Sequence, residues 1–464
     1  MITRNFVSRL TINYATSKLK MRYIPNTKED TEQMLKEIGV KSTDELFSDI
    51  PKSVFLSQKN LLKVPHALTE IDMRRHMKQL AGKNKINLIN FLGAGAYQHF
   101  IPSIVNHLIF RSEFYTAYTP YQAEMSQGIL QALYEYQSMI CELTGMDASN
   151  ASMYEGSTAL AESCTMAANI KKKKKILVSK TVHPEYREVV KTYAHFFGIE
   201  IKEIEYADGT TSLMDLKTNL DDETAGVIIQ SPNFFGIIEN LEQVSKIAHE
   251  ANALLIASFT DATSLGILNA PGNYADIVAG EGHAFGNPVN FGGPYYGIIT
   301  TKTDYVRSLP GRIVGATVDS DGKRGFTLTL QAREQHIRRE KASSNICTSQ
   351  VLNALAASIA LAALGKNGLK EVAEQNVQKA NYALSKLKEA GFRHVFSKPF
   401  YNEFVVKFDD VQKANRILLD NGIIGGLDLG RFYPELKNCA LFCVTELHSR
   451  ADIDKLVLCL KEAD

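Results

Sequence analysis

The sequence lacks an excess of charge of either sign. Its 464 residues include 52 Lys and Arg against 51 Asp and Glu, which gives a formal net charge of +1. A chain without a strong overall field does not attract a polyanion over a distance. We therefore expect no nucleic-acid partner, and we interpret the five lysines at 171–175 as the solvated end of a helix.

Long apolar runs are also absent. The longest one, residues 354–364, is interrupted by Ser358 and ends at Gly365. Because a membrane helix needs about 20 consecutive apolar residues, we expect no transmembrane segment and no membrane partner. The content of 45% hydrophobic and 22% charged residues is instead typical of a globular chain of two or three domains.

Cysteines are few, and the common metal and nucleotide motifs are missing. The six cysteines form no CxxC pair, and neither GxxxxGK[ST] nor HExxH occurs. We therefore predict no metal site, no P-loop, and thiols in a reducing compartment such as the cytoplasm. Cys439 and Cys443 lie in the apolar segment NCALFCV, which predicts that they are core residues.

The first 20 residues are basic and contain no acid, since the first acid is Glu29. This composition is similar to that of an organelle transit peptide, which would give a mitochondrial or related location. We favour a translation start placed too early, because Met21 opens the segment MRYIPNTKED, which looks like a natural beginning. Residues 1–20 are therefore either an early start or a targeting-like extension.

Local patterns divide the rest of the chain. Capping-box patterns at residues 27–30 and 42–45 predict two short helices within an N-terminal helical segment, residues 21–90. Apolar residues at helical spacing predict a helix over 125–144, and a second helix opens at Gly156.

Short apolar runs then alternate with helical patterns. The runs at 176–178, 226–229, 254–256 and 277–278 predict buried parallel strands with helices on both faces. We therefore predict an α/β fold, with a large, mainly parallel-sheet domain over 91–330. A connecting helix and a smaller α+β domain are expected over 331–464.

Gly156, Ser157 and Thr158 open a helix within this layout. A helix start offers backbone N–H groups, and here two hydroxyls, to a phosphate. The arrangement suggests a pyridoxal-phosphate transferase. Ser157 and Thr158 are explained equally well as helix caps.

Four long segments carry a family resemblance: residues 91–105, 118–162, 280–297 and 331–350. Together they resemble the glycine cleavage system P-protein, and most closely the first subunit of its two-subunit form. The resemblance covers residues 21–464 and implies the fold of type I pyridoxal-phosphate aminotransferases. It also implies decarboxylation of glycine, with transfer of the aminomethyl group to the lipoyl arm of the H-protein.

That chemistry requires a lysine to hold the cofactor and an acid facing its pyridine nitrogen. By the resemblance the lysine follows a histidine, eight residues after an aspartate that ends a strand. In this sequence the aspartate is Asp276, the histidine is His283, and the lysine position holds Ala284. The pyridine-facing position matches Ala257, and Asp261, four residues on, is expected to face elsewhere.

The chain is therefore expected to carry no covalent cofactor, with a vestigial phosphate site at Ser157 and Thr158. The resemblance implies a partner, the second P-protein subunit, which carries pyridoxal phosphate. Tyr97, Tyr118, Tyr121 and Glu124 are candidates for shaping the path of glycine and the lipoyl arm, or else they are packing residues.

The segment QAREQHIRRE is the last candidate. Its basic residues either steer an acidic lipoyl carrier or form a helix salt-bridged through Glu334 and Glu340. They are Arg333, His336, Arg338 and Arg339. Lys302 and Lys323 follow His283 in the sequence, but neither occupies the expected lysine position. Two alternatives to the subunit hypothesis remain open: a self-sufficient pyridoxal-phosphate enzyme using another, unrecognised lysine, and a non-enzymatic scaffold of the same fold.

Overall fold

The computed structural model describes residues 25–56 and 67–461, so the extension 1–20 lies outside the described residues. The chain divides into two compact units, Met1–Lys85 and Ile86–Asp464. Each is described by itself.

The first unit contains helices α2 (Lys28–Ile38) and α3 (Glu70–Ala81). The predicted capping box at the start of α2 is confirmed, because Thr27 and Asp30 bond to each other's backbone N–H groups. The second predicted helix is a 3-10 turn, η1 (Thr43–Phe47), and Ser42 makes no cap bond there. Helix α3 buries none of its residues, and its face at Met73, Met77 and Leu80 is exposed.

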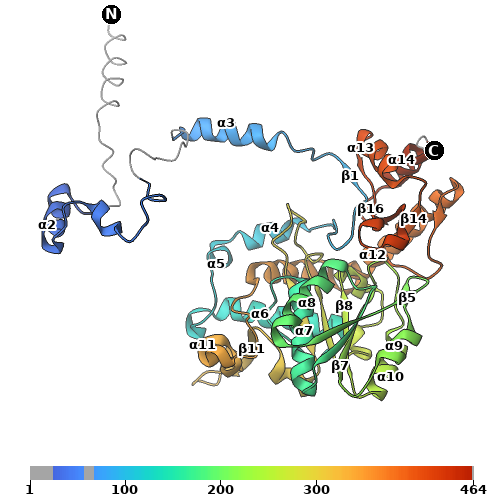
Figure 1. Ribbon diagram of the computed structural model, residues 1–464, viewed down its shortest axis with the longest axis horizontal. Helices are drawn as coiled ribbons and strands as arrows, with labels where there is room; N and C mark the ends of the chain where they lie inside the picture. Colours follow the sequence, from blue (N-terminus) through green and yellow to red (C-terminus); the bar gives the residue numbers. More distant parts are fainter. Residues whose placement is uncertain (1–24, 57–66, 462–464) are drawn as a thin grey trace, which may run out of the picture. The chain divides into compact units, whose positions relative to one another are not determined.

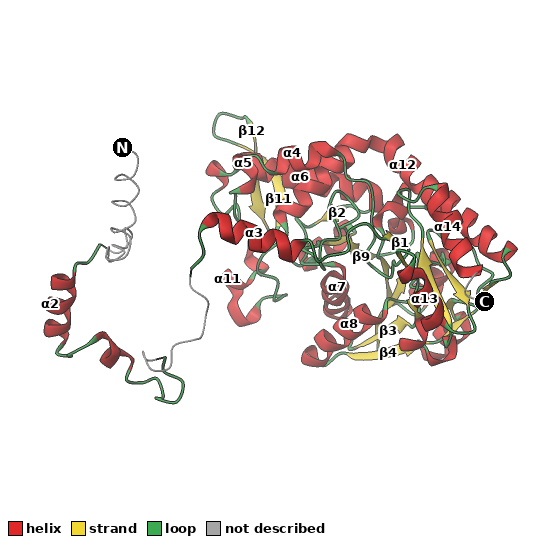
Figure 2. Cartoon of the chain, turned by 90° about the horizontal axis from the view of Figure 1, so that it is seen from above, coloured by secondary structure: helices red, strands yellow, loops and turns green. Residues whose placement is uncertain are grey.

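The second unit is built on a seven-stranded sheet of order β2-β10-β9-β8-β7-β3-β4 (Figures 1 and 2). Strands β9, β8, β7, β3 and β4 are parallel, and β10 runs antiparallel to β9 and β2. The bounds are β2 (Ala148–Ser149), β3 (Lys175–Ser179), β4 (Glu200–Ile204), β7 (Thr224–Gln230), β8 (Leu254–Phe259), β9 (Ile277–Glu281) and β10 (Gly297–Thr301). All four predicted apolar runs lie in the parallel strands, which confirms the predicted α/β fold.

Helices cover both faces of this sheet, which is why its strands are apolar on both sides. One core contains α6 (Gln127–Thr144), α10 (Leu241–Glu250) and the start of α12 (Val351–Glu389). The other contains α7 (Gly156–Lys171) and α8 (Pro184–Phe197), which Figure 1 shows in front of the sheet. In β8 the side chains alternate, with Leu255, Ala257 and Phe259 in the first core and Leu254 and Ile256 in the second.

The C-terminal domain has a four-stranded antiparallel sheet of order β13-β14-β17-β16 packed against α13 and α14. The bounds are β13 (Arg393–His394), β14 (Glu403–Lys407), α13 (Val411–Asp420), β16 (Leu427–Asp428), β17 (Cys439–Cys443) and α14 (Arg450–Lys461). Both cysteines of β17 are buried, as predicted. Strand β1 (Ile89–Asn90) pairs with β15 (Ile423–Ile424), so the chain around residue 90 belongs to this domain.

Shorter elements complete the second unit. They are α4 (Ser103–Ile109), α5 (Ser112–Tyr115), η2 (Ala123–Met125), β5 (Tyr206–Ala207), β6 (Thr210–Thr211), α9 (Leu213–Asn219), η3 (Ala262–Gly266), η4 (Pro271–Asn273), η5 (Thr303–Ser308), η8 (Leu429–Arg431) and η9 (Pro434–Leu436).

The connecting helix was predicted to begin at residue 331, and this predicted start is wrong. Strands β11 (Ile313–Val318) and β12 (Arg324–Thr329) form a hairpin, three short turns follow as η6 (Gln331–Arg333), α11 (Gln335–Arg338) and η7 (Arg339–Lys341), and α12 starts only at Val351. By length and composition α12 would pass for a membrane helix. Gly365, however, has φ 64° and ψ −178°, which breaks the helix, and the apolar part before it packs in the core.

The lysine run at 171–175 lies at the end of α7 and the start of β3. Lys172 ends the helix with φ 56°. The ammonium groups of Lys173, Lys174 and Lys175 donate to backbone carbonyls of neighbouring segments, and Lys175 also pairs with Asp221. Lys171 donates to the Asn252 side chain at 2.7 Å. The run extends beyond the predicted helix end, and four of its five charges are engaged by the chain itself.

Candidate functional site

The amino end of α7 is occupied by the chain's own carboxylate. Glu155 precedes the helix in an extended conformation, and its side chain accepts a 2.9 Å bond from the Thr158 backbone N–H. The same carboxylate accepts from both predicted phosphate ligands, the hydroxyls of Ser157 and Thr158. An anion is favoured at this position by the helix dipole and by the free N–H groups of the first turn.

A second carboxylate reaches the same turn from the end of β9. Glu281 accepts 2.9 Å from the N–H of Gly156 and 3.0 Å from the N–H of His283. A side chain at Gly156 would meet the Tyr186 hydroxyl at 2.4 Å and the Glu281 backbone at 2.8 Å. Glycine is therefore required here, because α7 begins in direct contact with β9.

The position at which the resemblance expects the cofactor lysine comes three residues after Glu281. His283 and Ala284 lie just beyond the carboxyl end of β9, and Ala284 is buried, with 6% of its surface exposed. The Nε2 atom of His283 accepts a 3.0 Å bond from the Tyr97 N–H, and the two rings stack. His283 is also stacked on Tyr295. The Nδ1 atom of His283 lies 3.6 Å from a Glu281 oxygen and is buried without a hydrogen-bond partner among the described residues.

Two expectations about the position that would face the pyridine nitrogen are wrong. Ala257 lies inside β8, paired with Ile229 and Val278, and packs in the core rather than at the edge of the sheet. Asp261 follows the carboxyl end of the same strand and does not face elsewhere, since it takes part in the polar cluster described below. The ungapped count from Gly266 could not show that β8 ends at Phe259, two residues before Asp261.

Asp276, in turn, precedes β9 and does not end a strand. Its carboxylate accepts from the Leu255 N–H at 2.8 Å and contacts His249 Nε2 at 2.9 Å. It therefore acts at the amino end of the strand, away from His283.

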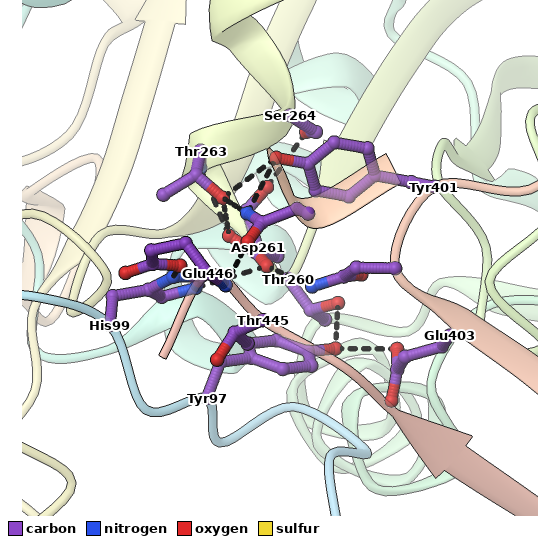
Figure 3. Close-up of polar contacts among 12 residues, drawn as sticks. Tyr97, His99, Thr260, Asp261, Thr263, Ser264, Tyr401, Glu403, Thr445 and Glu446 are labelled. Carbon is purple, nitrogen blue, oxygen red and sulfur yellow. Dashed lines mark hydrogen bonds and ion pairs between the residues drawn. The ribbon is translucent and has the colours of Figure 1, made fainter. Parts of the chain in front are cut away.

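Tyr97 connects three parts of the second unit (Figure 3). Its hydroxyl lies 2.9 Å from the Thr260 hydroxyl, at the end of β8, and donates a 2.9 Å bond to Glu403 in β14. The other Glu403 oxygen accepts from the Ala94 N–H at 2.6 Å. The glycine-rich loop at 93–97 is thereby fixed to both domains.

A second, charged group lies beside the first. His99 Nδ1 is 2.9 Å from Glu446, and His99 Nε2 is 3.2 Å from Asp261, with all three side chains at most 7% exposed. Asn402 donates to the same Asp261 oxygen at 2.6 Å. Figure 3 shows His99 between the two carboxylates.

Further polar side chains surround Asp261. Its other oxygen accepts from both the N–H and the hydroxyl of Thr263. The Thr263 hydroxyl lies 3.0 Å from the Tyr401 hydroxyl, and Asn376 donates to both. We call the connected set the polar cluster. Its members are Tyr97, His99, Thr260, Asp261, Thr263, Asn376, Tyr401, Asn402, Glu403 and Glu446.

Burial and charge shift the pKa values in this cluster in opposite senses. Burial disfavours the charged His99 ring, but Asp261 and Glu446 outweigh that effect and raise its pKa to about 10. Burial raises the pKa of Glu403 to about 8, against the opposing bonds from Ala94 and Tyr97. Near neutral pH we therefore expect an imidazolium between two carboxylates, and a mostly protonated Glu403.

Of the four predicted pocket residues, only Tyr97 lies in this cluster. Tyr118 and Tyr121 are 80% and 58% exposed, and Glu124 is exposed as well. Tyr121 instead lies beside Arg312 and His336: Arg312 Nη2 donates to its hydroxyl at 3.0 Å, and the His336 ring is 6.4 Å away. Two segments that the sequence analysis treated separately, 118–124 and 331–340, thus meet.

The predicted salt-bridged helix at Arg333–Arg339 is largely absent. Among the residues that the structure describes, only His336 and Glu334 form an ion pair there, at 3.5 Å. Arg333 and Arg338 bond instead to the carbonyls of Gly311 and Ala332. The segment is a set of short turns in which opposite charges do not align at helical spacing.

Several site residues escaped the sequence analysis. Glu155 could have been found, because an acid directly before a Gly-Ser-Thr helix start competes with a phosphate, whereas Glu281 lies 125 residues from its partner Gly156. His99, Glu403 and Glu446 carried no such local signal, since their partners lie more than 150 residues away along the chain. No group of three or more His, Cys, Asp or Glu is placed to hold a metal ion within residues 25–56 and 67–461.

Comparison with known proteins agrees with this geometry. The family described as "Glycine cleavage system P-protein" matches residues 21–460. Curated relatives are "Probable glycine dehydrogenase (decarboxylating) subunit 1" from Anoxybacillus flavithermus, 54% identical over 94% of this chain and 98% of that one, and from Moorella thermoacetica, 54% identical over 95% and 99%.

Solved structures extend the comparison. An inhibitor-bound crystal structure of glycine decarboxylase (P-protein) matches with a TM-score of 0.86 and 43% identity over 96% of this chain and 100% of that one. The sphingosine-1-phosphate lyase of Burkholderia pseudomallei, 14% identical with a TM-score of 0.64 over 87% and 92%, shares the fold alone. The predicted fold of type I pyridoxal-phosphate enzymes is confirmed, and the chain belongs to the glycine cleavage system P-protein family.

Proposed function

We propose that this chain is the subunit of a two-subunit glycine decarboxylase that does not bind pyridoxal phosphate. In this proposal a second, homologous subunit carries the cofactor. The heteromer decarboxylates glycine and passes the aminomethyl group to the lipoyl arm of the H-protein. The names of the relatives, with their "subunit 1", support a heteromer.

The observation that carries the proposal is the occupied amino end of α7. In a cofactor-binding chain of this fold those N–H groups would hold a phosphate. Here the carboxylates of Glu155 and Glu281 accept from the N–H groups of Thr158 and Gly156. A phosphate brought to the same place would meet two carboxylates, and like charges in a partly buried site repel strongly.

The lysine position supports the same conclusion. Ala284 has no amine with which to hold an aldehyde cofactor, and Tyr97 covers the neighbouring His283. The residues present therefore do not fit pyridoxal phosphate, and we derive no catalytic step from this chain alone. Its role in the proposal is to complete the partner's site and to receive the H-protein.

The test is reconstitution with the candidate partner subunit. We expect glycine decarboxylation only when both chains and the lipoylated H-protein are present, and one pyridoxal phosphate per heterodimer. The matched control is a partner whose own cofactor lysine is replaced by alanine, which should assemble and remain inactive. An absorbing aldimine on the isolated chain, lost on replacing Lys302 or Lys323, would instead establish the self-sufficient alternative.

A scaffold role without catalysis predicts a different result. In that case the partner would decarboxylate glycine at the same rate with and without this chain. We expect the partner alone to be inactive.

We further propose that the protein acts in the cytoplasm. The basic segment 1–20 is the only feature that suggests an organelle. Fusing residues 1–20 to a fluorescent protein tests this directly: diffuse fluorescence supports the cytoplasm, and import into an organelle supports a transit peptide.

A further inference from the structure

Arg312 is a buried charge without a counter-ion. Only 6% of its surface is exposed, and no carboxylate of the described residues lies within 4 Å of its guanidinium. Its Nη2 donates to the Tyr121 hydroxyl at 3.0 Å, while its buried Nε and Nη1 have no acceptor. Buried guanidinium groups are almost always paired, because an uncompensated buried charge is strongly unfavourable.

The surroundings of Arg312 add positive charge and supply no negative charge at contact distance. Arg333 reaches the preceding residue, where its Nη2 donates to the Gly311 carbonyl at 2.7 Å. The Nε of Arg333 is also buried without an acceptor, and burial lowers the pKa of this arginine. The guanidinium groups of Arg312 and Arg333 therefore both lie at residues 311–312, and neither has an ion-pair partner among the described residues.

Tyr121, which covers the Arg312 guanidinium, is itself exposed to solvent. The Tyr121 ring lies over the guanidinium, with its centroid 5.2 Å from Cζ, and yet 58% of Tyr121 is exposed. Its neighbours Tyr118 and Met125 are about four-fifths exposed, at 80% and 79%. Exposed aromatic and apolar side chains on one short segment are a feature of protein interfaces, where arginines and tyrosines that become buried often dominate the binding energy.

We propose that Arg312 is the receptor for a carboxylate of the partner subunit, which docks over residues 118–125 and reaches Nε and Nη1 after a side-chain rearrangement there, because both atoms are buried in the isolated chain. The planar guanidinium matches a carboxylate, and the Tyr121 ring would help to exclude water from the pair. Charge complementarity selects this occupant, because an apolar partner would leave Arg312 unpaired in the complex as well. The inference rests on the proposed heteromer but concerns only where it assembles.

The test compares Arg312→Met with wild type in two states. In the isolated chain the substitution removes an uncompensated charge and keeps the aliphatic length, so we expect an unchanged or higher Tm. In the heteromer it leaves the partner's carboxylate unpaired, so we expect the Kd for the partner to rise about 30-fold or more. A purely structural arginine would lower the Tm of the isolated chain and leave the Kd unchanged.

Two controls separate the outcomes. Arg416→Met, at an exposed arginine of α13, should change neither quantity. Acetate or phosphate, added to the isolated wild-type chain at constant ionic strength, should not raise its Tm. A rise that Arg312→Met abolishes, with the Kd for the partner unchanged, would assign the site to a free anion and overturn the proposal. If wild-type chains fail to assemble at all, the proposed function fails; if both variants assemble equally, only this inference fails.

Discussion

The Tyr97 hydroxyl donates a 2.9 Å hydrogen bond to Glu403, and this bond joins the loop before α4 to strand β14 of the C-terminal domain. Thr260, at the carboxyl end of β8, contacts the same hydroxyl at 2.9 Å. A single buried side chain thus connects both domains at the carboxyl edge of the sheet, where open α/β sheets generally bind their ligands. Because the packing of the two domains buries Glu403, it also raises the pKa of this carboxyl group.

The first prediction concerns pH. The pKa of Glu403 is raised from 4.5 to about 8 by burial, so between these values the folded chain holds a proton that the unfolded chain has lost. The free energy of unfolding should therefore fall as the pH rises across this window. Glu403→Gln keeps an acceptor oxygen for the Ala94 N–H, turns an NH2 donor towards the Tyr97 oxygen and cannot ionise, so its stability should depend less on pH. Urea unfolding at several pH values measures both slopes, and equal slopes would contradict the assignment.

The second prediction concerns His99. Replacing it by alanine leaves Asp261 and Glu446 buried without their cation, and breaking such a buried pair typically costs about 3–5 kcal/mol. We expect a loss of this size in urea unfolding at neutral pH. His107→Ala, at an exposed position of α4, should change stability by less than about 0.5 kcal/mol.

The same histidine predicts a second pH effect. Because the pKa of His99 is raised from 6.5 to about 10, its stabilising contribution is complete below 6.5 and disappears as the pH rises through 10. The difference in stability between wild type and His99→Ala should therefore shrink in alkaline solution. A constant difference would mean that the imidazole is neutral in the folded chain.

The fold was predictable because its signals are local. The apolar runs in β3, β7, β8 and β9 are continuous because both faces of the sheet are covered, and the Thr27–Asp30 box needs only four residues. The start of the connecting helix was missed because the polar segment before Val351 resembles an exposed helix in composition.

The site was less predictable because its contacts are distant in sequence. Tyr97 was selected for its glycine-rich loop, but nothing near it indicated Glu403, which lies 306 residues further along the chain. The acid at the end of β8 was misplaced by four residues, because an ungapped count cannot detect where a strand ends. Contacts such as His99 with Glu446 depend on the packing of two domains, which no local pattern encodes.

The third prediction restores the missing lysine. Ala284→Lys alone should not bind pyridoxal phosphate, because Glu155 and Glu281 still occupy the amino end of α7. Adding Glu155→Gln removes one carboxylate and should increase phosphate affinity, although Glu281 remains. Aldimine absorbance on titration with the cofactor is the measurement. A full aldimine signal from Ala284→Lys alone would show that the two carboxylates do not exclude the phosphate.

The last prediction concerns Tyr121, whose hydroxyl accepts from Arg312 Nη2 at 3.0 Å. Tyr121→Phe keeps the ring over the guanidinium and removes only this hydrogen bond, which adds a further unpaired N–H to Arg312. One such bond is typically worth about 0.5–1.5 kcal/mol, so kcat/KM for glycine in the reconstituted enzyme should fall about twofold to tenfold if the bond acts in the transition state. Assembly is checked separately by the Kd for the partner. Tyr115→Phe, at an exposed tyrosine outside the docking segment 118–125, is the matched control and should leave both quantities unchanged. If Tyr121→Phe changes neither kcat/KM nor the Kd, the hydroxyl has only a packing role.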